Sequence, residues 1–137
     1  MAQKPTKQTK TKFIIKILEE IYPQTPIPLN HKSNFELLIA VLLSAQCTDE
    51  RVNKVTPELF KKANTPFKMA KMSTQTIYEI IRPCGLAPKK SSAIYELSKI
   101  IIKKYDGKVP DNFKDLEELP GVGHKTASVV MSQGFGY

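Results

Sequence analysis

The chain has 137 residues, a formal net charge of +8 and 41% hydrophobic residues. This length suits one domain, and this share of hydrophobic residues excludes a chain that is disordered throughout. The excess of lysine and arginine favours a negatively charged partner, nucleic acid before an anionic membrane surface.

The sequence gives no sign of a metal centre, a disulfide framework or a membrane span. The only cysteines, Cys47 and Cys84, form no CxxC motif or Cys/His cluster, so we expect isolated thiols in a reducing compartment. No apolar run approaches the roughly 20 residues that cross a bilayer, and the N-terminus lacks the apolar core of a signal peptide. We therefore expect a cytoplasmic protein that binds no metal and no membrane.

The N-terminal part of the chain divides into a tail and a helix. Residues 1–12 carry lysines and no acid, as expected for a disordered basic tail. Apolar residues then recur with helical spacing over 13–21 and predict a helix, which the prolines at 23, 26 and 28 end.

The rest of the sequence also has helical periodicity. Ser33 and Glu36 form an S-x-x-E capping box before FELLIAVLLSAQ, a stretch with no polar face that predicts a buried central helix. Further helices are expected over 52–60, capped by Thr48 or Asp49, after Ser73, over 94–105, and over 112–118. No two-residue alternation is sustained, so the chain is predicted to be all-α.

The stretch LPGVGHK, residues 119–125, has the pattern of a helical hairpin. A turn at 121–123 would separate a helix ending near residue 120 from one starting near His124. Glycine permits positive φ and lets a bulky ligand approach the backbone, and free N–H groups at a helix start attract an anion. On a basic chain we expect this anion to be a DNA phosphate, contacted without sequence readout. A purely structural corner between two helices is the alternative.

Lys125 falls in the first turn of the helix after this turn. The helix dipole disfavours positive charge there, which favours the neutral amine, a nucleophile able to form a Schiff base with an aldehyde-like carbon. The alternative is a charged lysine that only touches a phosphate.

Four segments in the same order resemble the endonuclease III family of DNA glycosylases: FELLIAVLLSAQCTDERVN (35–53), CGLAPKKSSAI (84–94), DGKVPDNFKDLEELPGVG (106–123) and LPGVGHKTASVV (119–130). The resemblance implies the all-α helix-hairpin-helix DNA glycosylase fold, a six-helix barrel plus the hairpin, with an incomplete second lobe. The expected division is a basic tail (1–12), the N-terminal helix and linker of the second lobe (13–29), the helical barrel (30–111), the helix-hairpin-helix (112–131) and a truncated end (132–137).

The resemblance implies base-excision repair of double-stranded DNA by a monomer associated with the bacterial nucleoid. Such enzymes flip a damaged nucleotide out of the duplex, remove oxidised pyrimidines, and cleave the strand at the abasic site. In the family, a lysine at the position of Lys125 attacks the sugar C1′, expels the base and leaves an imine that permits β-elimination.

The resemblance also assigns DNA contacts. Gln46 would fill the gap left by the flipped nucleotide, or it is an ordinary polar residue ending a buried helix. Leu86 would wedge into the base stack opposite the lesion, or it is an exposed loop leucine that packs locally. Asp49 matches an acid near the pocket mouth, although an N-cap role explains it as well.

Phosphate contacts are expected at two places. Lys89 and Lys90, beside Leu86, would meet phosphate or lie on a solvated face. In the hairpin, the expected contacts are Gly121, Val122, Gly123, His124 and Thr126.

Two family features would lie beyond Tyr137: the catalytic aspartate of a V-D-T-H-like segment, and four cysteines that bind a [4Fe–4S] cluster. We therefore expect the N-terminal part of such a protein, no cofactor in this chain, an exposed apolar face on the 13–21 helix, and impaired glycosylase activity. The alternatives are a non-catalytic helix-hairpin-helix DNA-binding fragment and a non-functional remnant.

Overall fold

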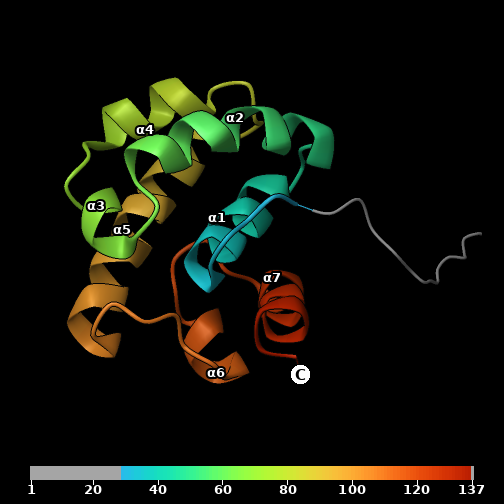
Figure 1. Ribbon diagram of the computed structural model, residues 1–137, viewed down its shortest axis with the longest axis vertical. Coiled ribbons are helices and arrows are strands. Elements are labelled where there is room, and N and C mark those ends of the chain that lie inside the picture. Colours follow the sequence, from blue (N-terminus) through green and yellow to red (C-terminus); the bar gives the residue numbers. More distant parts are fainter. Residues whose placement is uncertain (1–28, 137) are drawn as a thin grey trace, which may run out of the picture.

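The computed structural model describes residues 29–136, and every regular element among them is a helix (Figure 1). The predicted all-α class is therefore confirmed. The predicted tail at 1–12, the predicted helix at 13–21 and Tyr137 lie outside the described residues.

Helix α1 (Asn34–Ser44) is the buried central helix that the sequence predicts. Ser33 accepts the N–H of Glu36 at 3.1 Å, and the Glu36 carboxylate accepts the N–H of Lys32 at 2.9 Å. The capping box thus closes on Lys32, one residue earlier than the pattern predicts. Every residue from 35 to 43 is buried, and each buried leucine or isoleucine contributes roughly 1.5–3 kcal/mol. α1 is consequently the helix around which the others pack.

Helices α2 (Asp49–Lys62) and α4 (Thr74–Ile81) lie above α1 in Figure 1. Their caps, Thr48 and Ser73, each accept the N–H of the third residue that follows, at 3.1 Å. Of the two predicted caps for α2, Thr48 is therefore the actual one, and Asp49 is the first helical residue.

The short helix α3 (Pro66–Met69) was not predicted. A single turn has too few residues to show a repeat, so the periodic pattern could not reveal it. The available signal was Thr65 followed by Pro66, a capping residue directly before a proline at the first helical position.

Helix α5 (Ala87–Tyr105) is the longest element and ends where the sequence predicts. Asp106 and Gly107 adopt left-handed φ angles of 57° and 84°. A Cβ on Gly107 would lie 2.5 Å from two ring carbons of the exposed Phe67, so a larger residue would have to displace this ring and would also be strained by the positive φ. The helix end is therefore fixed by both conformation and packing.

The chain then forms α6 (Phe113–Glu117) and α7 (His124–Val129), the predicted hairpin, which continues into the π-helical segment η1 (Val130–Gly134). Nothing in the sequence predicted η1. The hairpin packs below α1 in Figure 1, and the hydrophobic core runs without a break from α1 into it through Leu116 and Val122.

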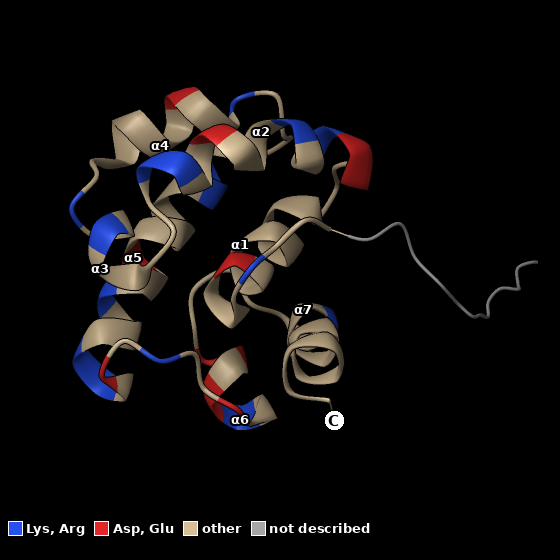
Figure 2. Ribbon diagram, viewed as in Figure 1, with Lys and Arg blue, Asp and Glu red and all other residues tan. Residues whose placement is uncertain are grey.

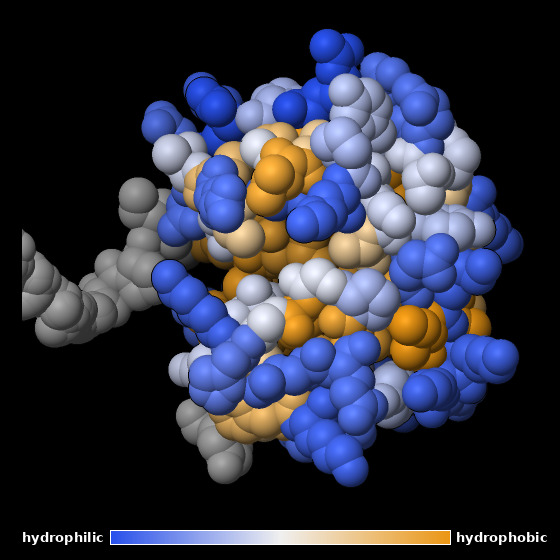
Figure 3. All heavy atoms as spheres, turned by 180° about the vertical axis from the view of Figure 1, so that it is seen from behind, coloured by the Kyte–Doolittle hydropathy of each residue, from blue (hydrophilic) through white to orange (hydrophobic). Residues whose placement is uncertain are grey.

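Seen from behind, the surface is mostly hydrophilic, with a band of hydrophobic atoms across its middle (Figure 3). Among residues 29–136, none of the helices has the length and apolar character needed to cross a membrane.

Candidate nucleic-acid interface

Two loops meet where α1 ends and α5 begins. We call them the loop pair: residues 45–48 and residues 82–86. The Arg51 guanidinium donates to the carbonyl of Pro83 at 3.4 Å, and a Cβ on Gly85 would lie 3.2 Å from the carbonyl oxygen of Gln46. The two loops are therefore in backbone contact.

The loop pair brings Gln46 and Leu86 together on neighbouring loops. Both have left-handed φ angles, 56° for Gln46 and 61° for Leu86. This conformation costs a residue with a Cβ roughly 1–2 kcal/mol, and such outliers concentrate at functional sites. Both residues are exposed, Leu86 to 48%. The fold thus presents an amide and an apolar side chain to solvent from two strained positions.

Lys89 and Lys90 have different environments. Lys89 is exposed, whereas Lys90 is only 5% exposed and its Nζ donates to the carbonyls of Leu43 at 2.9 Å and Ala45 at 2.6 Å. The expectation that Lys90 meets phosphate or lies on a solvated face is therefore wrong. Two adjacent lysines in a sequence suggest that both side chains are exposed, but the spacing of residues along α5 turns the Lys90 side chain toward the core.

The two cysteines lie in the loop pair and are both free, as the sequence predicts, but they are close enough for Cys47 to influence the titration of Cys84. Cys84 is buried and Cys47 is partly buried. Burial, followed by the Cys47 thiol, raises the pKa of Cys84 to about 12, although the charges of Lys90 and Arg51 act in the opposite direction. Cys84 is consequently a neutral thiol at physiological pH.

The two glycines of the hairpin turn have different roles. Gly121 has a φ of 78°, and a Cβ there would lie 2.8 Å from the Cβ of Ala93 and 3.1 Å from Cδ1 of Leu42. Gly123 has a φ of −93°, and a Cβ there would have no neighbour within 4 Å. Gly121 therefore lets the turn pack against α1 and α5, while Gly123 leaves open space beside the start of α7.

Helix α7 begins without a side-chain cap. Side chains cap α1, α2, α3, α4 and α6, whereas α5, which starts after Leu86, and α7, which starts after Gly123, have none. His124 and Lys125 are exposed in the first turn of α7. Uncapped N–H groups at the positive end of a helix dipole suit an anion, and here they adjoin open space.

The other expected hairpin contacts are less accessible. The Val122 side chain is buried and its N–H donates to the carbonyl of Leu119 at 3.1 Å. Thr126 is half-buried. Access for a ligand is therefore concentrated at the residues that flank Val122 and at the start of α7.

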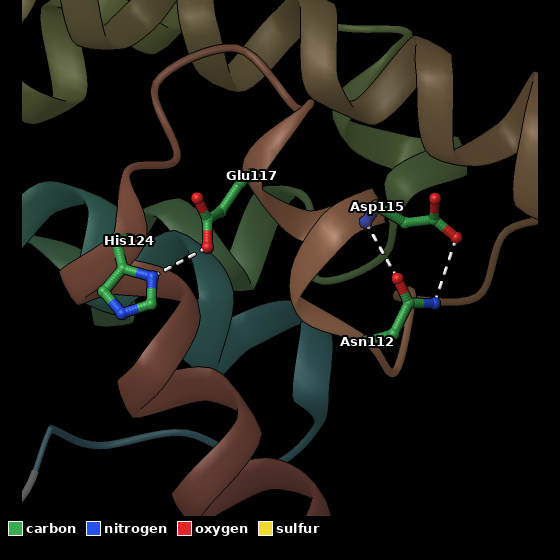
Figure 4. A network of polar contacts seen from close by, with 4 residues as sticks. All are labelled: Asn112, Asp115, Glu117 and His124. Atoms are coloured by element: carbon green, nitrogen blue, oxygen red, sulfur yellow. Dashed lines mark hydrogen bonds and ion pairs between the residues drawn. The ribbon is translucent and has the colours of Figure 1, made fainter.

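A polar contact that the sequence does not predict joins the two helices of the hairpin (Figure 4). The His124 ring is hydrogen-bonded through Nδ1 to the Glu117 carboxylate at 2.8 Å and stacks on Phe113 with ring centroids 5.6 Å apart. Figure 4 also shows Asn112 accepting the N–H of Asp115, the cap of α6. The His124 contact orients the residue directly before Lys125.

Figure 2 shows positive charge on α2, α3, α5 and α7, and acidic residues on α1, α2, α4 and α6, the last of which also carries a basic residue. The basic character of the chain therefore belongs to several helices, and α6 brings negative charge close to the hairpin turn.

The chain does not fit an iron–sulfur cluster. A [4Fe–4S] cluster needs four thiolates, and the sequence holds two cysteines. Between residues 29 and 136, no group of three or more His, Cys, Asp or Glu side chains could hold a metal ion. No chemistry of this chain is therefore assigned to a cluster.

The loop pair and the hairpin turn share one support. The turn packs at Gly121 on Leu42, one helical turn before Gln46, and on Ala93, two turns after Leu86. The same ends of α1 and α5 therefore position the loop pair and the uncapped start of α7.

Residues 39–132 match the family model described as HhH-GPD superfamily base excision DNA repair protein. The chain is 50% identical over 119 residues to endonuclease III of Buchnera aphidicola, covering 87% of this chain and 55% of that protein. It is 44% identical over 124 residues to endonuclease III of Escherichia coli K12, covering 90% of this chain and 59% of that protein.

A solved structure of a trapped endonuclease III–DNA covalent intermediate is similar to this chain, with a TM-score of 0.81 and 43% sequence identity. The match covers 96% of this chain and 62% of the chain in that structure. The chain thus spans less than two thirds of each of these relatives. Because the family model covers most of its length, the chain belongs to the HhH-GPD superfamily of base excision DNA repair proteins, within which it is similar to endonuclease III.

Proposed function

We propose that this chain binds double-stranded DNA at damaged or abasic nucleotides and acts there as an N-glycosylase and abasic-site lyase on oxidised pyrimidines. The observation that carries the proposal is Lys125, exposed in the first turn of a helix whose start is uncapped and open. The relatives named above are bacterial proteins, and we propose that this chain acts as a monomer on the bacterial chromosome.

Binding would use two different kinds of contact. The open start of α7, at Gly123 and His124, is suited to a backbone phosphate because its N–H groups have no side-chain cap. From the loop pair, Gln46 would enter the gap left by a flipped nucleotide, and Leu86 would wedge into the stack on the opposite strand. Lys89 would add attraction for phosphate.

The proposed chemistry is imine formation by Lys125. At an abasic site, the amine adds to the C1′ aldehyde of the ring-opened sugar and loses water, which gives an imine. A proton then leaves C2′, the C3′–O bond breaks with the phosphate as leaving group, and water releases the lysine. With a damaged base still attached, the same attack at C1′ would expel the base. The endonuclease III relative trapped as a covalent intermediate with DNA supports a covalent step.

The alternative is a helix-hairpin-helix module that binds DNA without chemistry. The exposed hairpin and the basic charge fit both functions. A covalent adduct between a lysine and DNA is the observation that distinguishes the two functions.

The test is borohydride trapping on a duplex with one abasic site, since borohydride reduces an imine to a stable amine. The wild-type chain should become linked to the DNA, Lys125→Ala should lose at least 100-fold of the product, and Lys104→Ala, which removes an exposed lysine at the far end of α5, should match wild type. Equal trapping by Lys125→Ala overturns the lysine's role. Salt-dependent binding without trapping supports the non-catalytic module, and no binding overturns both.

A further inference from the structure

Lys90 fills a position that the DNA contacts proposed above do not explain. Its ammonium group is buried, and its two partners are the carbonyl oxygens of Leu43 and Ala45, at the C-terminal end of α1. A buried lysine is costly unless its donors are satisfied, and the negative end of a helix dipole stabilises it. The last turn of α1 has no basic residue of its own, so α5 supplies the positive charge.

The carbonyls at the end of α1 are otherwise satisfied within the chain. Val41 accepts from the Ser44 hydroxyl at 2.6 Å, Leu42 from the Ala45 N–H at 3.3 Å, and Ser44 from the Cys47 N–H at 3.1 Å. Lys90 completes this set. The carbonyl of Leu43 is bonded to the Lys90 ammonium, so removing that ammonium would leave a buried acceptor unpaired.

These bonds fix both peptide groups that flank Gln46. The Ala45 carbonyl, on one side, is held by Lys90, and the Cys47 N–H, on the other, is held by Ser44. Rotation of these two peptide planes is what φ and ψ of Gln46 describe. The left-handed conformation of Gln46 therefore depends on the Lys90 ammonium.

Lys90 also bonds to the second strained residue. Its backbone N–H donates to the carbonyl of Leu86 at 2.9 Å, the first hydrogen bond of α5. Lys90 is thus bonded to the peptide group that precedes Gln46 through its side chain and to Leu86 through its backbone, and it connects the two strained positions.

We propose that Lys90 is a positioning residue that sets the selectivity of the loop pair for disrupted over intact duplex DNA. The proposal rests on the proposed function, because Gln46 and Leu86 must contact DNA for their spacing to matter. Lys90 acts through Gln46 and does not touch the DNA itself.

The test compares binding to a duplex containing a stable abasic analogue with binding to the same duplex intact. Lys90→Met has nearly the same length and no donor, and we expect its preference for the abasic duplex to fall about tenfold, because Gln46 is no longer held in position. Lys90→Arg keeps a charge and donors and should recover part of that loss. Lys103→Met removes one exposed positive charge on the same helix and should leave the preference unchanged.

A second variant tests the proposal if Lys90→Met does not fold. Should Lys90→Met not fold, Lys90→Gln, a shorter donor, replaces it and must show a lower preference than Lys90→Arg. A folded Lys90→Met with wild-type preference, or an equal loss in Lys103→Met, overturns the proposal.

Hydrogen exchange separates this proposal from the proposed function. The amide of Cys47 should exchange at least tenfold faster in Lys90→Met, and the amides at the centre of α5 should not change. No preference for abasic DNA in the wild-type chain counts against the proposed function. An unchanged Cys47 exchange rate overturns the positioning role whatever the DNA result.

Discussion

The loop pair and the hairpin turn rest on the same ends of α1 and α5, yet they are built in opposite ways. In the loop pair, the left-handed positions are occupied by Gln46 and Leu86, which carry side chains and are strained. In the hairpin turn, the left-handed position is occupied by Gly121, which is not strained, and the open position by Gly123.

This difference follows from what each region must present. A side chain can be aimed only if its backbone is held, so the loop pair keeps residues with a Cβ in an unfavourable conformation and holds them with a buried lysine. A backbone N–H is presented best where side chains are absent, so the hairpin turn uses glycine. The loop pair thus depends on hydrogen bonds from a buried lysine, whereas the hairpin turn depends on the close packing of a glycine against α1 and α5.

The largest effect is expected for Gly121→Ala. It places a Cβ at a φ of 78° and within 2.8 Å of Ala93, so strain and overpacking should together lower the free energy of unfolding by about 2–4 kcal/mol. Gly123→Ala is the matched control and should change stability by less than about 1 kcal/mol, because its Cβ enters open space. Urea titration measures both.

DNA binding should reverse the order of the two glycine variants. Folded Gly123→Ala should bind duplex DNA several-fold more weakly, since its methyl group occupies the space proposed for a phosphate. Equal destabilisation by both substitutions would show that the two glycines do not differ as described.

The next effect concerns the pH dependence of stability at Cys84. Its pKa is raised in the folded chain to about 12, so the unfolded state loses this proton first as the pH rises above 9. The stabilisation is complete below pH 9 and is lost progressively toward pH 12. Between pH 8.5 and 10.5, wild type should lose about 1–2 kcal/mol more stability than Cys84→Ala, measured by urea titration at each pH.

Cys47→Ala provides the comparison within the loop pair. It removes both contributions of Cys47 to the raised pKa of Cys84 but leaves Cys84 buried, which is the largest cause, so part of the pH dependence should remain. Identical pH profiles for wild type and Cys84→Ala would mean that the pKa of Cys84 is not raised in the folded chain.

A smaller effect should come from relieving the strain at Leu86. At a φ of 61°, Leu86→Gly should be more stable than Leu86→Ala by about 1 kcal/mol, the reverse of the order in an ordinary helix. Both variants should lose about tenfold of the preference for an abasic duplex, because both lack the apolar wedge. Urea titration and paired binding measurements test this, and a more stable alanine variant would argue against strain.

The sequence predicted the helices with clear periodicity and most of their limits. Ser33 and Ser73 identified helix starts, and Asp106-Gly107 identified the end of α5, because caps and left-handed residues are local signals. It did not reveal the one-turn α3 or the π-helical η1, which have no periodic pattern.

Site positions depended on packing that local signals do not encode. Gln46 and Leu86 were singled out by resemblance, but their strain and their contact through Gly85 emerge only when α1 and α5 are in place. The same packing reversed the expectation for Lys90 and brought Cys47 next to Cys84. In each case, the local sequence does not show which residue of a distant segment the side chain will contact.

The smallest effect is expected for the contact between His124 and Glu117. The His124 side chain is 76% exposed, so a double-mutant cycle with His124→Ala and Glu117→Gln should give a coupling energy below about 1 kcal/mol. Glu117→Gln alone should also strengthen DNA binding two- to threefold, because it removes a negative charge beside the proposed phosphate site. A coupling energy as large as the loss of unfolding free energy expected for Gly121→Ala would mean that this polar contact holds the hairpin together. The hairpin would then depend on an added side-chain contact, as the loop pair does on Lys90, and the distinction between the two regions would fail.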